Sequence, residues 1–250
     1  MKKDTSWDNA AGWYHELLES EGTYQKDLIL PNILRLLQIK PGEKILDLAC
    51  GQGFFSRAFK EQGAEVTGID SSAKLIGIAK EKSRDIKYFV LKANELAAIN
   101  SASIDKAVII LALQNIENLK TVFMECARVL KSKGRLYAVI NHPAFRIPKA
   151  SSWEYDEERG IQYRRVEKYL SESKAKIFTH PGSNPKEYTL TFHRPLQTYV
   201  KNLANSGFCI RRLEEWNSLK KSQPGKRAAA ENLARKEVPF FLAIEAEKLN

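Results

Sequence analysis

The stretch that decides the fold lies between residues 44 and 55. It reads Lys44-Ile45-Leu46-Asp47-Leu48-Ala49-Cys50-Gly51-Gln52-Gly53-Phe54-Phe55. The apolar residues around Asp47 predict a buried strand that passes directly into a helix. Gly51 and Gly53 suit a turn whose backbone comes within contact distance of a ligand, because a Cβ atom would fill that space.

A second acid, Asp70, ends the next predicted strand, where a carboxylate can accept hydrogen bonds from two ribose hydroxyls. The glycines and Ser56 nearly satisfy the dinucleotide pattern GxGxxG, which is weak evidence when it stands alone. A pyrophosphate needs amide donors and positive charge, so the carboxylate of Asp47 is badly placed for NAD. Acid, glycine turn and second acid together indicate a cationic nucleoside ligand.

Outward from this stretch, short apolar runs alternate with segments long enough for crossover helices. The strand candidates are 44–49, 65–70, 86–91, 105–111 and 135–141. The helix before the last of these is expected to end at Lys133-Gly134. This alternation predicts an α/β fold: a Rossmann-like, seven-stranded, mostly parallel sheet with helices on both faces.

The flanking segments predict four parts. Residues 1–40 form an N-terminal helical cap with helices at 6–20 and 23–38, the second interrupted by Pro31. The α/β core occupies 41–142. Residues 143–194, rich in aromatics, form a lid or substrate insertion after the fifth strand, with runs 161–169 and 186–193 pairing as a hairpin. Residues 195–250 add helix 195–206 and strands 208–213 and 238–244 to the sheet.

Residues 41–141 resemble the class I S-adenosylmethionine-dependent methyltransferases, in the style of the small-molecule, type 11-like group, whose first motif is an acid followed by alternating glycines. The resemblance implies S-adenosylmethionine as cofactor. In it, Asp47 orients the turn and the methionine ammonium, and Asp70 holds the ribose. The full set of implied cofactor-binding residues is Tyr14, Asp47, Ala49, Cys50, Gly51, Gly53, Asp70, Ser71, Leu75, Asn94, Leu111 and Gln114.

The chain departs from the family pattern at two places. Ala49 replaces the first glycine of the pattern. Many family members tolerate this replacement because the methyl side chain of alanine is small. After the third strand the family usually has an acid that accepts the adenine amino group, and Ala93-Asn94-Glu95 stands there instead. The amide oxygen of Asn94 can accept that hydrogen bond, with Glu95 as the alternative.

The acceptor side is expected at the ends of the fourth and fifth strands. His142 follows the fifth strand and is the candidate catalytic residue, as a proton acceptor; the alternative is a histidine that only hydrogen-bonds to the lid. Asn115 is a substrate candidate or a helix cap. Tyr24 is a core aromatic or closes over the ligands. Phe145 and Arg146, in the insertion, are the other substrate candidates.

Composition restricts the function classes. The 250 residues hold 40 Lys and Arg against 30 Asp and Glu, a net charge of +10, which favours anionic partners without identifying one. Three scattered cysteines provide neither a disulfide framework nor a metal site, and no apolar run suggests a membrane span or signal peptide, so we expect a cytoplasmic protein.

The resulting hypothesis is methyl transfer to an oxygen or nitrogen of a small-molecule acceptor. The alternatives are a tRNA or rRNA methyltransferase, prompted by the charge and the Arg/Lys-rich segments 164–168 and 211–236, and a non-catalytic cofactor-binding module. Nucleic acid is possible but not favoured, no membrane partner is expected, and the sequence leaves the oligomeric state open.

Overall fold

The computed structural model describes residues 7–8, 10–178 and 188–249. Its centre is a seven-stranded sheet in the order β10-β11-β5-β4-β1-β2-β3. Five of these strands are parallel: β1 (Lys44–Leu48), β2 (Glu65–Asp70), β3 (Lys87–Val90), β4 (Ile104–Ile110) and β5 (Leu130–Asn141). The last two, β10 (Phe208–Trp216) and β11 (Phe241–Lys248), are antiparallel to their neighbours. The predicted fold class is confirmed.

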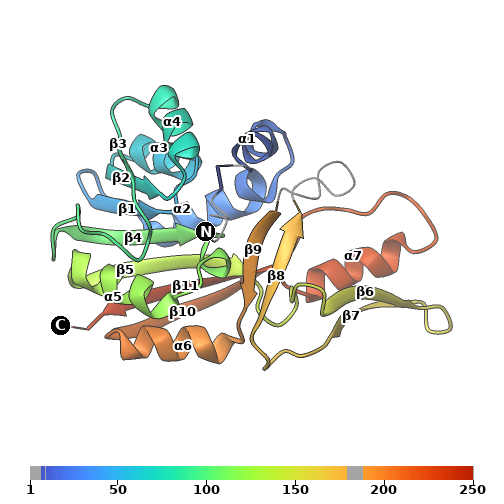
Figure 1. The fold of residues 1–250 in the computed structure, drawn as a ribbon. Helices are drawn as coiled ribbons and strands as arrows, with labels where there is room; N and C mark the ends of the chain where they lie inside the picture. Colours follow the sequence, from blue (N-terminus) through green and yellow to red (C-terminus); the bar gives the residue numbers. More distant parts are fainter. Residues whose placement is uncertain (1–6, 9, 179–187, 250) are drawn as a thin grey trace.

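Helices cover both faces of this sheet (Figure 1). On one face lie α2 (Leu30–Leu37), α3 (Phe54–Glu61) and α4 (Ala73–Lys82), packed on side chains such as Ile45 and Val139. On the other lie α5 (Leu119–Val129) and α6 (Leu196–Asn205), packed on Leu46 and Ala138. Because successive side chains of a strand point to opposite faces, both of which are covered, the central strands are apolar almost throughout.

The N-terminal part differs in detail from its prediction. The first helix, α1 (Ala11–Glu19), begins later than the expected 6–20, and residues 1–6 and 9 lie outside the described residues. A π-helical turn, η1 (Gln25–Ile29), continues directly into α2. Pro31 is the second residue of α2, directly after this turn, and it has no N–H to donate to the carbonyls of η1.

Two boundaries in the core were wrong. Helix α5 ends at Val129, and Lys133 and Gly134 lie inside β5, where the pairing with β4 shifts between Ile104 and Lys106. Lys133 has a φ of 58°, so these residues produce an irregularity in a strand instead of a helix end. The last strand, β11, begins at Phe241, three residues after the expected start of the strand predicted at 238–244.

The segment after β5 contains two hairpins instead of one. β6 (Ser151–Asp156) pairs with β7 (Ile161–Val166), and β8 (Ser173–Phe178) pairs with β9 (Tyr188–His193). The expected pairing of 161–169 with 186–193 is therefore wrong: each run pairs with its nearest neighbour in sequence, which costs less loop-closure entropy.

These hairpins occupy different places in Figure 1. β8 and β9 stand across the carboxyl ends of the parallel strands. The β6–β7 hairpin extends away from the sheet beside α7 (Ala228–Glu237), a helix that the sequence did not predict and that contacts β7. Within the described part of the chain, no helix is long and apolar enough to cross a bilayer.

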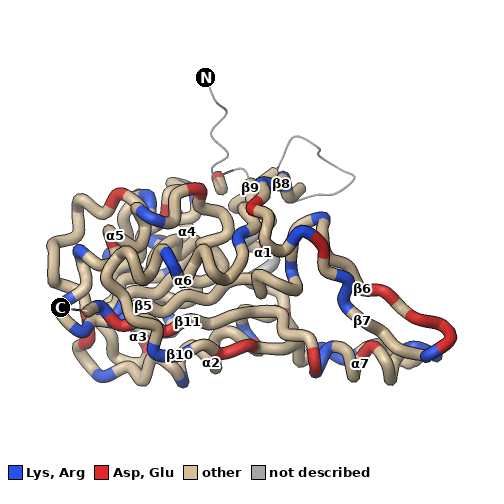
Figure 2. The backbone as a smooth tube through the Cα atoms, turned by 90° about the horizontal axis from the view of Figure 1, so that it is seen from below, with Lys and Arg blue, Asp and Glu red and all other residues tan. Residues whose placement is uncertain are grey.

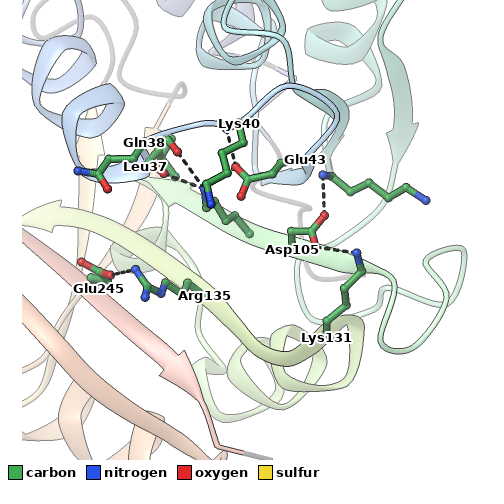
Figure 3. Close-up of polar contacts among 10 residues, drawn as sticks. Leu37, Gln38, Lys40, Glu43, Asp105, Lys131, Arg135 and Glu245 are labelled. Carbon is green, nitrogen blue, oxygen red and sulfur yellow. Dashed lines mark hydrogen bonds and ion pairs between the residues drawn. The ribbon is translucent and has the colours of Figure 1, made fainter.

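Polar contacts close the amino edge of the sheet, where Figure 3 shows Glu43, Asp105 and Lys131. Lys106 donates from Nζ to the carbonyl oxygen of Leu37 at 2.8 Å and contacts Glu43 at 2.5 Å. Asp105 accepts from the backbone N–H of Lys44 at 2.9 Å and pairs with Lys131 at 2.6 Å. These contacts bind the C-terminus of α2 to β4 and identify this edge as structural.

Replacing Lys106 by methionine is expected to lower the free energy of unfolding by about 2 to 3 kcal/mol. Methionine keeps much of the aliphatic volume, but the buried Leu37 carbonyl and the Glu43 carboxylate lose their donor. Urea unfolding measures the change. Lys80→Met, at an exposed position of α4, is the matched control and should stay within about 0.5 kcal/mol of the parent. A Lys106 variant as stable as that control would contradict the prediction.

Candidate functional site

A cavity of about 580 Å³ lies along the carboxyl edge of the parallel strands. Its walls come from the ends of β1 to β5, from the N-terminal segment and from the β8–β9 hairpin. The volume is within the range of small-ligand sites. Ligands of open α/β sheets bind at this edge, so the position agrees with the sequence-based expectation. Eight of the predicted cofactor residues line it: Ala49, Gly51, Asp70, Ser71, Leu75, Asn94, Leu111 and Gln114.

The turn after β1 is built from alternating left-handed residues. Ala49 has a φ of 53°, Gly51 of 57° and Gly53 of 74°. A non-glycine residue in this region costs about 1 to 2 kcal/mol, so Ala49 adopts it only because the surrounding turn requires it. The turn directs the N–H of Gly51 to the Asp70 carboxylate, which accepts it at 2.9 Å.

Asp70 connects two loops. One carboxylate oxygen accepts from Gly51, and the other accepts from the backbone N–H of Ser72 at 2.8 Å. Ser72 in turn caps α4, its hydroxyl accepting from the N–H of Leu75 at 3.1 Å. Burial raises the pKa of Asp70, and the two N–H donors offset only part of that rise. Each oxygen retains a lone pair for a ligand hydroxyl.

Asp47 lies beneath the turn and does not line the cavity. Strand alternation places it on the same face as Ile45, under α3, and it accepts a hydrogen bond from the Ser56 hydroxyl at 2.6 Å. Burial raises the pKa of this carboxyl to about 7, the Ser56 bond opposes the rise, and the charge of Asp70 adds to it. The side chain therefore fixes the start of α3 against β1; a contact with a ligand ammonium stays a prediction.

Two other residues of the turn also lie outside the cavity lining. The thiol of Cys50 donates to the Gly51 carbonyl at 3.7 Å, and burial raises its pKa, which removes it as a nucleophile. Gly53 is required for a reason that the sequence did not reveal. A Cβ atom there would lie 2.3 Å from Oη of Tyr88, so the tyrosine by itself opposes a side chain at this glycine.

The end of β4 joins the cavity to the β8–β9 hairpin. Leu111 has a φ of 54°, and its carbonyl accepts from Nε2 of Gln114 at 2.6 Å. Asn115 donates its amide to the Leu190 carbonyl at 2.8 Å, and the Thr191 hydroxyl donates to the Gln114 carbonyl at 3.3 Å. β9 is thereby attached to the short helix η2 (Leu113–Asn115).

His142 does not lie where the sequence placed it. It is 5% exposed and does not line the cavity. Its Nε2 contacts Glu215 at 2.7 Å, and its Nδ1 accepts from the N–H of Ala144 at 3.2 Å. Burial lowers its pKa, although Glu215 opposes the shift. The strand ends at Asn141, as predicted, and Asn141 lines the cavity, whereas His142 holds the following turn. Its role as a proton acceptor stays a prediction.

Of the four substrate candidates, Asn115 and Arg146 line the cavity and two others do not. Tyr24 shares a hydrogen bond with the Ser218 hydroxyl at 2.9 Å and packs on two phenylalanines of the last strand region. The ring of Phe145 lies 4.7 Å from that of His142. Tyr14 is in α1, but its side chain lies outside what the structure describes.

The sequence indicated the insertion as a substrate segment but did not single out the residues outside the core that form walls of the cavity. β8 and β9 contribute Ile177, Leu190 and Phe192, and the N-terminal part contributes Trp7 and Gln25. The alternating run 186–193 and the aromatic content of the insertion were the available signals. Across the described residues, no group of three potential metal ligands is present.

Known proteins resemble both the sequence and the structure. A family model described as "Methyltransferase domain" matches residues 46–138. The demethylmenaquinone methyltransferase of Thermotoga maritima is 38% identical over 103 residues, 40% of this chain and 44% of that protein. The ubiquinone biosynthesis O-methyltransferase of Idiomarina loihiensis is 33% identical over 100 residues, 38% of this chain and 41% of that protein. The matched segments thus span less than half of these curated relatives.

A solved structure matches over most of the chain. The crystal structure of an S-adenosylmethionine dependent methyltransferase from Mesorhizobium loti is 26% identical, with a TM-score of 0.69. The match covers 87% of this chain and 96% of that chain. The likeness therefore includes the sheet and parts of the chain outside the family-model match.

Proposed function

The chain belongs to the class I S-adenosylmethionine-dependent methyltransferases, and we propose that it transfers the methyl group of this cofactor to an oxygen or nitrogen atom of a small-molecule acceptor. The observation that carries the proposal is the connected pair of Gly51 and Asp70 at the rim of one cavity. That pair provides a turn free of side-chain bulk beside a carboxylate with lone pairs to spare.

The residues present fit the cofactor. Asp70 would accept from the ribose hydroxyls, Ser71 and Leu75 would flank the adenine, and Asn94 would accept from its amino group. Leu111 and Gln114 would border the methionine end. Two observations beyond position support this assignment. Oε1 of Gln114 is buried without a hydrogen-bond partner among the described residues, and the buried acids Asp47 and Asp70 favour a ligand with positive charge.

The cofactor supplies an electrophilic methyl group on a sulfonium, and the thioether that remains after transfer is a good leaving group. The chain supplies position: the strand ends fix one ligand, and β8, β9 and the N-terminal tryptophans enclose the rest of the cavity and exclude water. Holding two reactants in line contributes several kcal/mol to lowering the barrier. Because His142 is engaged elsewhere, we propose that positioning, and not a histidine base, provides the catalysis.

The named relatives, which act in quinone biosynthesis or on demethylmenaquinone, support a small-molecule acceptor. In 164–168, one of the two basic segments that prompted the RNA alternative, both arginines have partners within the protein. Arg164 donates to the Phe145 carbonyl at 2.7 Å and to the Ser151 hydroxyl at 2.8 Å, while Arg165 contacts Glu154 at 3.5 Å. Figure 2 shows acidic and basic residues interspersed over the fold, including the β6–β7 hairpin. A surface that binds a phosphate backbone would instead gather Lys and Arg residues on one face.

Calorimetric titration and a transfer assay test the proposal. S-adenosylhomocysteine should bind with micromolar affinity and NAD should not. Labelled S-adenosylmethionine should then transfer its methyl to members of a panel of phenols, hydroxyacids and amines. Binding without turnover on any acceptor would favour the non-catalytic module. Turnover on bulk tRNA with steep salt dependence would favour the RNA enzyme, and absence of S-adenosylhomocysteine binding would reject the function altogether.

A further inference from the structure

Arg146 is a cation in the cavity with no carboxylate to neutralise it. Among the described residues, four charged side chains line the cavity: Asp70, Lys92, Glu117 and Arg146. Asp70 holds two backbone N–H groups, Lys92 lies 4.0 Å from Glu95, and Glu117 lies 3.3 Å from Lys174. For the Arg146 guanidinium, the described part of the chain offers neither an acidic partner within 4.0 Å nor a hydrogen-bond acceptor.

The surroundings of Arg146 hold the guanidinium without satisfying it. Its central carbon lies 5.3 Å from the ring centre of Phe240 and 5.1 Å from that of Phe241. Aromatic faces attract a cation but accept none of its five N–H donors in line. Burial lowers the pKa of Arg146, Tyr24 opposes that shift, and the nearby Arg164 adds to it; no carboxylate is among the causes.

Backbone and side-chain contacts hold the turn that carries Arg146. The Arg146 N–H donates to the His142 carbonyl at 2.9 Å, and the His142 ring accepts from Ala144 within the same turn. Glu215 and Phe145 hold that ring from two sides. This gives His142 a role as a positioning residue: it sets the turn that brings Arg146 to the cavity.

Sheet order places Arg146 on the acceptor side. The residues proposed for the cofactor follow β1, β2 and β3 and the end of β4, whereas Arg146 follows β5, on the other side of β4. The same cavity has apolar walls at Ile116, Ile177 and Phe192. A half-buried guanidinium beside apolar walls suits a ligand that combines an anionic group with an apolar body, because the guanidinium can bind two oxygens of a carboxylate or phosphate at once.

We infer that the acceptor carries a carboxylate or phosphate group on an apolar body, and that Arg146 binds this group. The inference rests on the proposed function, since it assigns the acceptor half of the same cavity.

The test uses three probes on the complex with saturating S-adenosylhomocysteine: benzoate, phenyl phosphate and the neutral benzamide. Ligand-observed NMR titration measures their affinities. The inference expects at least one anionic probe to bind at least tenfold more tightly than benzamide. The better anion distinguishes a carboxylate from a phosphate acceptor.

Two variants assign the preference to the guanidinium. Arg146→Gln should abolish the preference for anions while changing the affinity for S-adenosylhomocysteine less than threefold, and Arg146→Lys should retain part of it. Arg159→Gln removes the same charge at the turn after β6 and should keep the full preference, which controls for net charge.

Three outcomes would overturn the inference. Equal affinity for benzoate, phenyl phosphate and benzamide in the parent protein would do so without any variant. An anion preference that survives Arg146→Gln would place the anion elsewhere. A loss of more than tenfold in S-adenosylhomocysteine affinity in a folded Arg146→Gln protein would assign the guanidinium to the cofactor's own carboxylate. In all three the cofactor complex still forms in the parent, so the proposed function stands apart from this result.

Discussion

Replacing Asp70 by asparagine is expected to weaken S-adenosylhomocysteine binding by at least about 100-fold, the equivalent of about 3 kcal/mol. The carboxylate accepts from the N–H groups of Gly51 and Ser72 and, in the proposed complex, from ribose hydroxyls. Asparagine offers one acceptor oxygen and an NH₂ group that faces one of these N–H donors. The change therefore loosens the turn and removes charge-assisted bonds to the ligand at once.

Titration calorimetry at pH 8 measures this loss, with urea unfolding to confirm that the variant is folded. Asp85→Asn is the control, because Asp85 is 66% exposed and pairs only with Lys60 at 3.9 Å among described residues. That variant should bind like the parent. An Asp70→Asn protein that is folded and binds within threefold of the parent would remove Asp70 from the site.

The core of this fold could be predicted because local signals agreed with the global arrangement. The run around Asp47, the acid at Asp70 and the glycine turn together specified the sheet edge, and the family resemblance that they support implied eight of the residues that line the cavity. Ser72 caps α4, since a serine hydroxyl at this position satisfies a free helical N–H.

The acceptor side could not be predicted, because long-range contacts determine it. The end of β5 was predicted at residue 141, but the contact of His142 with Glu215, which comes from β10, draws its ring away from the cavity and has no local signal. Tyr24 gave no sign that it would pack on Phe240 and Phe241, which lie more than 200 residues away. The pairing of β8 with β9, which forms a wall of the cavity, was obscured by a weak alternation in 173–178.

Gly53 shows the same limit, because its partner Tyr88 comes from another strand. Gly53→Ala is expected to lower the free energy of unfolding by about 3 kcal/mol. Alanine at this position would have to adopt a left-handed φ of 74°. Its Cβ atom would lie 2.3 Å from Oη of Tyr88 and 2.9 Å from its Cζ. Urea unfolding of the protein without ligand measures the loss, so a ligand clash cannot produce it.

Gly77→Ala is the matched control for Gly53→Ala. It lies inside α4 with nothing within 4 Å of the added Cβ, and it should gain about 0.5 to 1 kcal/mol from the higher helix propensity of alanine. The second variant of the test is Tyr88→Phe, which removes the hydroxyl that would clash and, by itself, costs about 1 kcal/mol for the bond to Ser83 at 3.0 Å.

The double variant Gly53→Ala with Tyr88→Phe separates steric from backbone effects. If the hydroxyl is the main obstacle, the two losses will not add, and the double variant should be at least about 1 kcal/mol more stable than their sum. The remaining deficit measures the left-handed backbone, which no change at Tyr88 relieves. Strict additivity of the two losses would mean that the turn, and not the tyrosine, requires glycine at this position.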